Sequence, residues 1–171
     1  MEYNRYEDLR KFQRNILNRK QLSETLISYI AGGIIEALYY IHIKNKIIHM
    51  DIKPQNILID EFLNIKLTDF SISINYKKLN CINLPMAGTP YYMSPEALNK
   101  REILASEASK IDIYSLGVLL YNLAFYDYPY KLNDVDSKDF TQIAKNIKKK
   151  NLEFPQDNGL SKAFLDFLKN A

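Results

Sequence analysis

The stretch from His49 to Asn56, which reads His-Met-Asp-Ile-Lys-Pro-Gln-Asn, constrains the fold of this chain more than any other. An apolar pair, Ile47-Ile48, precedes it, and an apolar run, Ile57-Leu58-Ile59, follows it. This pattern predicts a strand, a polar loop and a second strand. Pro54 fixes its own backbone and biases Lys53 before it towards an extended conformation. A loop that places a carboxylate, an ammonium and a carboxamide between two buried strands is a candidate for chemistry.

Composition limits the class of protein. A chain of 171 residues with 47% hydrophobic content can build one good core, and a net charge of +3 does not argue for nucleic acid or membrane binding. The single cysteine, Cys81, excludes a disulfide framework and a cysteine-rich metal site. No run approaches the length of a membrane span, and the charged N-terminus is not a signal peptide. We therefore expect a soluble, reduced, intracellular protein that works in the cytoplasm or another intracellular compartment.

Apolar periodicity predicts a mainly helical chain. Ser23 opens a long amphipathic helix that ends at Asn45, and the pair Gly32-Gly33 in its middle predicts close packing against a neighbouring element. Residues 111–125 are apolar on almost every side, which predicts a buried central helix. The remaining predicted helices cover residues 7–17, 94–98, 138–149 and 161–170.

Two polar residues outside the loop stand at informative places. Asp112 lies at the start of the buried helix, so its carboxylate is expected to accept backbone hydrogen bonds. His42 is expected on the surface of its helix or at the edge of the core. The tyrosines at 126, 128 and 130 are expected to pack under a connecting loop, and residues 148–150 to form a solvated helix end.

A hairpin is predicted beside the polar loop. After a strand at about 47–49, strands at 56–60 and 64–68 flank a short turn. Antiparallel pairing of the last two brings Asn56, at the start of the hairpin, close to Asp69, at its end. Two oxygen ligands there can hold Mg²⁺ and leave positions for water and phosphate. Residues 71–93 lack periodicity and are predicted to form a long loop.

Four motifs then occur in an order that resembles the eukaryotic serine/threonine protein kinases. They are His49-Met-Asp-Ile-Lys-Pro-Gln-Asn56, Thr68-Asp-Phe-Ser71, Gly88-Thr-Pro-Tyr-Tyr-Met-Ser-Pro-Glu96 and Asp112-Ile-Tyr-Ser-Leu-Gly117. The resemblance covers nearly the whole chain and implies a fold of class α+β, mainly α: the large C-terminal lobe with a small hairpin at its catalytic face and no N-lobe. Residues 1–171 would form a partial kinase domain, from the hinge to the penultimate helices of this lobe.

The resemblance also implies a role for each residue of the polar cluster. Asp51 would accept or orient the proton of the substrate hydroxyl, and Lys53 would neutralise the transferred phosphoryl group. Asn56 and Asp69 would hold Mg²⁺ against ATP, and Thr89 would tie the substrate loop to the catalytic loop. The implied cofactors are ATP and Mg²⁺, and the implied partner is a protein with a Ser or Thr hydroxyl.

Further residues would bind the nucleotide or support the site. Glu2 and Tyr3 resemble the hinge between the two lobes, Asp8 stands where an acid reaches the ribose or the substrate, and Leu58 would lie beneath the adenine. Structural support is implied for His49, Phe70, Glu96 and Asp112, with Asp112 bracing the catalytic loop and Glu96 pairing with a later arginine.

The chain departs from the family pattern in several ways. It contains no Gly-rich phosphate loop, no Val-Ala-Ile-Lys strand and no helix with the partner Glu, so the missing N-lobe is expected in a longer parent protein. No arginine follows Arg101 to pair with Glu96, and Ser71 replaces a glycine. As a chain of 171 residues it is expected to be inactive alone.

Met50 replaces an arginine that binds a phosphorylated activation loop in many family members. Residues 74–88 contain no Ser or Thr, and Tyr76 is their one hydroxyl. The hypothesis is a loop that phosphorylation does not switch. Mass spectrometry that finds an activating phosphate on residues 76–89 would contradict it.

Three functions stay open. The first is a serine/threonine kinase represented by one lobe, and the second is a pseudokinase-like lobe that binds partners without catalysis. The third, a small-molecule phosphotransferase of related fold, is disfavoured because residues 88–98 match a peptide-binding segment.

Overall fold

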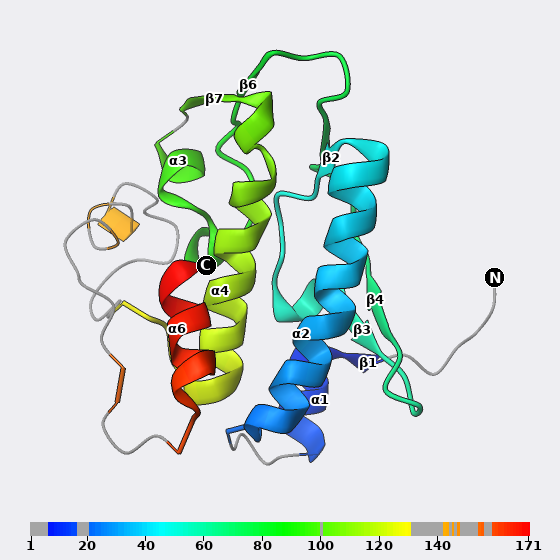
Figure 1. Ribbon diagram of the computed structural model, residues 1–171, viewed down its shortest axis with the longest axis vertical. Helices are drawn as coiled ribbons and strands as arrows, with labels where there is room; N and C mark the ends of the chain where they lie inside the picture. The colour runs from blue at the N-terminus through cyan, green and yellow to red at the C-terminus, as the bar shows by residue number, and fades with distance from the viewer. Residues whose placement is uncertain are drawn as a thin grey trace.

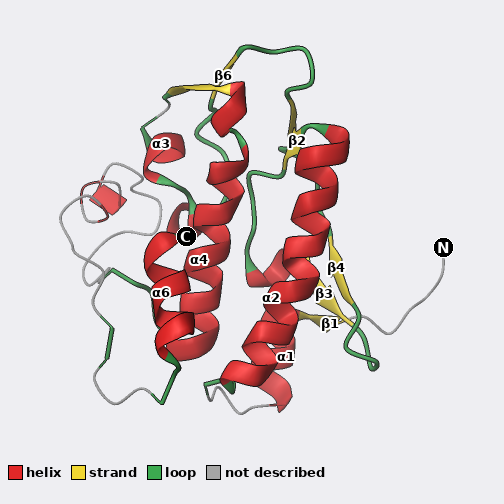
Figure 2. Ribbon diagram, viewed as in Figure 1, coloured by secondary structure: helices red, strands yellow, loops and turns green. Residues whose placement is uncertain are grey.

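The computed structural model describes residues 7–16, 21–99, 101–130, 142, 143, 145, 147, 154, 155 and 159–171. The predicted hinge residues Glu2 and Tyr3 lie outside this part, as do residues 148–150 and most of the helix predicted at 138–149. Within the described part the chain is mainly helical with small antiparallel sheets (Figures 1 and 2). This agrees with the predicted class, whereas the absence of a second lobe stays a prediction.

Two long helices, α2 and α4, lie side by side and form the centre of the molecule (Figure 1). Among the described residues the α-helices are α1 (Leu9–Ile16), α2 (Glu24–Tyr39), α3 (Pro95–Leu98), α4 (Ser109–Phe125) and α6 (Lys162–Asn170). A π-helical turn, η1 (Tyr40–Asn45), extends α2, so the helical run ends at Asn45 as the sequence predicts.

Local chemistry fixes where α2 begins and how it packs. The Ser23 hydroxyl accepts a hydrogen bond from the Leu26 N–H (3.4 Å), which caps the helix. Gly33 packs against β4 so closely that a Cβ there would lie 2.8 Å from Ile65 Cβ, whereas a Cβ at Gly32 would meet nothing within 4 Å. The predicted close packing is therefore confirmed for one of the two glycines.

The run Glu24–Asn45 also has the length and composition of a membrane span, with 22 residues and an 18-residue window of mean hydropathy 1.4. The prediction that no run approaches this length is therefore wrong. The helix core of a globular protein passes the same test, and here the side chains of Ile27, Ile30 and Ile34 are fully buried within the molecule.

The central helix α4 is buried on nearly every side, as predicted. Its residues join a core cluster that includes Ile30 and Ile34 of α2 and Phe164 of α6. A second buried cluster lies around α3 and the start of α4, and contains Ile48, Met50 and Ile82.

The hairpin predicted beside the polar loop His49–Asn56 is present, with shorter strands. A 3-10 turn, η2 (Pro54–Asn56), leads into β3 (Ile57–Ile59), which pairs antiparallel with β4 (Ile65–Leu67) in the register Ile57 to Leu67. A third short strand, β1 (Glu7–Asp8), pairs with the other edge of β3.

The prediction of an unbroken loop at 71–93 is wrong in part. Short strands occur there: β5 (Ile74–Asn75) pairs with β2 (Ile47–Ile48), and β6 (Cys81–Asn83) pairs with β7 (Glu102–Leu104). A 3-10 turn, η3 (Pro90–Tyr92), follows, and another, η4 (Ala105–Glu107), precedes α4. Strands of two or three residues are too short for a period to be visible, and their pairing depends on distant partners.

Candidate functional site

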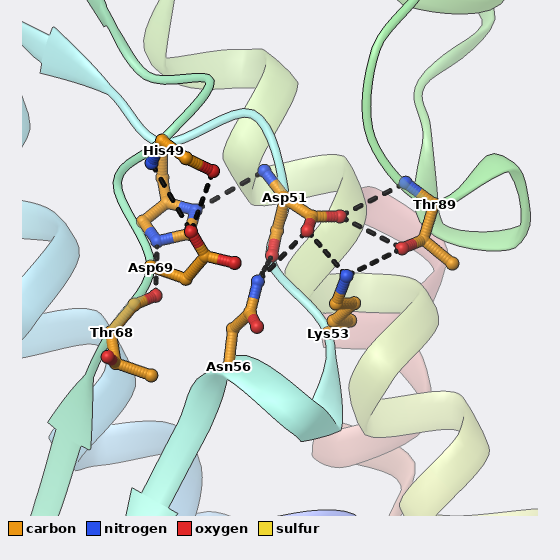
Figure 3. Close-up of polar contacts among 8 residues, drawn as sticks. His49, Asp51, Lys53, Asn56, Thr68, Asp69 and Thr89 are labelled. Atoms are coloured by element: carbon orange, nitrogen blue, oxygen red, sulfur yellow. Dashed lines mark hydrogen bonds and ion pairs between the residues drawn. The ribbon is translucent and has the colours of Figure 1, made fainter.

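Asp51 is the centre of a hydrogen-bonded network at one end of the β3–β4 hairpin (Figure 3). Its carboxylate is 8% exposed. One oxygen, Oδ1, accepts from the backbone N–H and the hydroxyl of Thr89, both at 3.0 Å. The other, Oδ2, accepts from Lys53 Nζ at 2.5 Å and from Asn56 Nδ2 at 3.0 Å. All four donors hold the carboxylate in one orientation.

Lys53 bridges the catalytic loop and the segment that carries Thr89. Its backbone is extended (φ −158°, ψ 162°), as the following Pro54 predicts. Its ammonium donates to Asp51 and to Thr89 Oγ1, the latter at 2.9 Å. The side chain is 20% exposed, so its charge is accessible from the solvent side of the site.

Gly88 allows the Thr89 segment to approach the loop. Its φ is +113°, and a Cβ at this position would lie 2.9 Å from the Met50 carbonyl oxygen. Only glycine accepts both the backbone conformation and the close contact. Gly88 belongs to one of the four sequence motifs, but the motif alone did not predict a role for it.

Asn56 and Asp69 lie at the same end of the hairpin, where the Thr68 N–H donates to the Asn56 carbonyl oxygen at 3.0 Å. Asn56 donates from Nδ2 to the Asp51 carbonyl oxygen (2.8 Å) and carboxylate, and no hydrogen bond to its Oδ1 is found among the described residues. The Ser71 hydroxyl donates to Asp69 Oδ1 at 2.7 Å, and with the Ser71 backbone N–H it holds the pKa of Asp69 below its ordinary value. Asp69 is therefore ionised at neutral pH.

This donor set fits Mg²⁺, a hard cation that takes oxygen ligands and keeps several waters. The Oδ1 atom of Asn56 and the exposed carboxylate of Asp69 would hold the ion, and phosphate would complete its coordination. Among the described residues no three His, Cys, Asp or Glu side chains form a metal cluster.

Asp112 stabilises the backbone of the loop through its carboxylate. It is fully buried, and its carboxylate accepts from the backbone N–H groups of His49 (2.8 Å) and Met50 (2.9 Å). This confirms that the buried acid accepts backbone hydrogen bonds. A third contact joins its Oδ2 to His42 Nε2 at 2.8 Å.

The expectation for His42 is therefore wrong. Its side chain is buried, and it reaches Asp112 from the π-helical turn η1. Helical periodicity alone did not identify this contact, because the turn rotates side chains away from an ideal α-helical face and the partner is 70 residues away.

His49 is a packed residue with a defined tautomer. The Asp51 N–H donates to its Nδ1 at 3.3 Å, so the ring proton is on Nε2, which donates to the Thr68 carbonyl oxygen at 2.9 Å. The Phe70 ring lies edge-on at 4.7 Å between centroids. These contacts connect the loop to the strand end that carries Asp69.

The remaining predicted residues are less closely connected to the network. Asp8 pairs with Leu58 in the strand register, and its carboxylate forms an ion pair with Lys11 (3.1 Å). No ion pair joins Glu96 to another described residue, and Arg101 meets it only through a backbone hydrogen bond. Burial, and then the charge of Glu96, raise the pKa of Tyr114 to about 12.

Comparison with known proteins gives a match over the full chain. The family described as "Protein kinase domain" matches residues 1–171. A dual specificity mitogen-activated protein kinase kinase, jkk-1 of Caenorhabditis elegans, is 37% identical over 146 residues, or 85% of this chain and 33% of that protein. The serine/threonine-protein kinase shk2 of Schizosaccharomyces pombe is 34% identical over 81% of this chain and 23% of its own length. Human NUAK family SNF1-like kinase 1 is 38% identical over 67% and 17%. The chain thus spans at most a third of these relatives.

Proposed function

The chain belongs to the protein kinase family, and we propose that it carries the catalytic loop of an intracellular serine/threonine kinase that transfers the γ-phosphoryl group of ATP to protein hydroxyls. One observation supports this most strongly. The buried carboxylate of Asp51 is held by Lys53 and Asn56 of the same loop and by Thr89 of the motif Gly88–Glu96. Phosphoryl transfer needs positioning and charge neutralisation rather than covalent chemistry, and this network supplies both.

Each group has a distinct task in the proposed reaction. Asp51 orients the substrate hydroxyl and takes up its proton as the oxygen attacks phosphorus. Lys53 places a positive charge beside the negative charge of the transferred phosphoryl group. Asn56 and Asp69 hold the Mg²⁺ that, when bound, neutralises the phosphates of ATP. Thr89 positions the peptide segment against Asp51.

Replacing Asp51 tests the proposal. In the protein expressed from its whole coding sequence, Asp51→Asn should lower kcat for a Ser/Thr peptide by about 10²- to 10⁴-fold, because the amide cannot accept the proton. The matched control is Asp166→Asn on exposed α6, which should retain full activity. Activity of Asp51→Asn equal to that of the parent protein would exclude the assigned role.

The test also separates the alternative of a pseudokinase-like binding lobe. A folded parent protein without phosphotransfer, in which Asp51→Asn changes nothing, would favour that lobe. Activity on tyrosine as well as on Ser and Thr would correct the proposed specificity.

A further inference from the structure

A polar cavity of about 370 Å³ lies beside the catalytic loop, and its lining residues are not part of the Asp51 network. Arg10, Gln13 and Arg14 of α1 line one side, and Pro54 and Tyr92 line another. Pro54 directly follows Lys53, and Tyr92 follows Thr89 by three residues, so the cavity flanks both segments that hold Asp51. In Figure 1, α1 lies at the same end of the molecule as the C-terminal end of α4.

The cavity carries positive charge that no ion pair among the described residues neutralises. Arg10 and Arg14 are one helical turn apart, so they share a face of α1. Neither forms an ion pair with another described residue. The neighbouring Lys11 is different, because Asp8 neutralises it at 3.1 Å. Asp127, which lies between the lining residues Tyr126 and Tyr128 in the sequence, does not line the cavity and accepts at Oδ1 from the Tyr128 N–H at 2.7 Å.

Gln13 gives an independent indication of a ligand. Its side chain is 3% exposed, it lines the cavity, and its Nε2 has no hydrogen-bond partner among the described residues. A buried N–H without an acceptor is unfavourable, so the site lacks an acceptor that a ligand would bring. The other buried unpartnered atom, Gln55 Oε1, is an acceptor on a residue that does not line the cavity.

The tyrosines that line the cavity, Tyr92, Tyr126 and Tyr128, add phenol hydroxyls to it. The Tyr92 and Tyr128 rings meet edge to face, with centroids 5.7 Å apart. Burial, and then the neighbouring Tyr128, raise the pKa of Tyr92 well above its ordinary value, so its hydroxyl stays protonated. Two guanidinium groups, an amide N–H and phenol hydroxyls together form a set of donors that suits an oxyanion.

We propose that this cavity binds an anionic side chain of the protein substrate, a carboxylate or a phosphate, close to the hydroxyl that receives the phosphoryl group. The proposal rests on the proposed function, because it assigns the cavity to the substrate of that reaction. It gives the enzyme a preference for Ser or Thr in acidic or previously phosphorylated surroundings.

Peptide binding to the 171-residue chain tests this without ATP. Four peptides each carry one Ser, and its neighbours on both sides are Glu in the first peptide, phosphoserine in the second, Ala in the third and Lys in the fourth. NMR spectra of the protein record the Nε–Hε signals of Arg10 and Arg14 as each peptide is added. The Glu or phosphoserine peptide should shift both signals and bind about tenfold more tightly than the Ala peptide. Whichever of these two peptides binds more tightly identifies the preferred anion as a carboxylate or a phosphate. Equal binding of the Glu, phosphoserine, Ala and Lys peptides, or anion binding that leaves both arginine signals unmoved, would overturn the proposal.

Variants locate the anion and separate binding from folding. Arg10→Ala/Arg14→Ala should remove the preference, whereas Lys44→Ala/Arg101→Ala, which removes two exposed charges elsewhere, should keep it. Gln13→Met keeps the volume and removes the unpartnered donor, so it should raise Tm and weaken anion binding together. A fall in Tm with unchanged anion binding would show that Gln13 stabilises the fold and does not bind the anion, which would contradict its assigned role. Because these assays need no phosphotransfer, their failure is distinct from that of Asp51→Asn.

Discussion

At the scale of single residues, the loop His49–Asn56 depends on the buried carboxylate of Asp112. Asp112 satisfies two successive backbone N–H groups, and those belong to His49 and Met50, which immediately precede Asp51. Met50 adopts a φ of +72°, a conformation unusual for a residue with a side chain. The carboxylate therefore holds a backbone turn that the local sequence does not favour.

Asp112→Asn should reduce the free energy of unfolding by about 2–4 kcal/mol, because an amide offers one acceptor oxygen where three donors converge. Urea denaturation measures this, with the surface variant Asp166→Asn as the control that changes stability by less than about 0.5 kcal/mol. A loss for Asp112→Asn no larger than that of the control would mean that the loop keeps its shape without the brace.

At the scale of elements, α2 and β4 meet through a glycine. Gly33→Ala should destabilise the protein by about 1–3 kcal/mol, because the new Cβ would overlap Ile65, although alanine favours helix more than glycine does. Gly32→Ala is the matched control: it meets no atom within 4 Å and should stabilise by up to about 1 kcal/mol. Thermal melts that show the same sign for both variants would contradict this packing.

The segment of residues 71–93 supports the hypothesis of a loop without a phosphorylation switch. Met50 is 3% exposed and packs with Ile82 of β6 in an apolar cluster, where a cation would be unfavourable. The Tyr76 hydroxyl donates to the His42 carbonyl oxygen at 3.1 Å, and burial, with the charge of Asp112, raises the pKa of Tyr76. The one hydroxyl in residues 74–88 is thus engaged within the fold.

At the scale of the whole molecule, the proposed function assigns one side of a nucleotide site to the described residues. The hairpin and the loop His49–Asn56 would provide the metal and phosphate contacts, whereas the sequence has no Gly-rich loop and no strand lysine of the family type. MgATP should therefore cause no measurable change in the Tm of the 171-residue chain. The protein expressed from the whole coding sequence is the positive control and should gain stability with MgATP. A clear shift for the 171-residue chain would overturn the expectation that its site is incomplete.

The sequence by itself determined the family, the polar loop, the hairpin and the buried central helix. These features are encoded locally, in motifs, caps and periodicity, and the pairing of adjacent strands follows from a short turn. Tertiary structure decided the rest. The contact of His42 with Asp112, the short strands of residues 71–93 and the cavity at Arg10, Gln13 and Arg14 join segments far apart in the chain. Such contacts depend on how helices pack, which no local pattern in the sequence records.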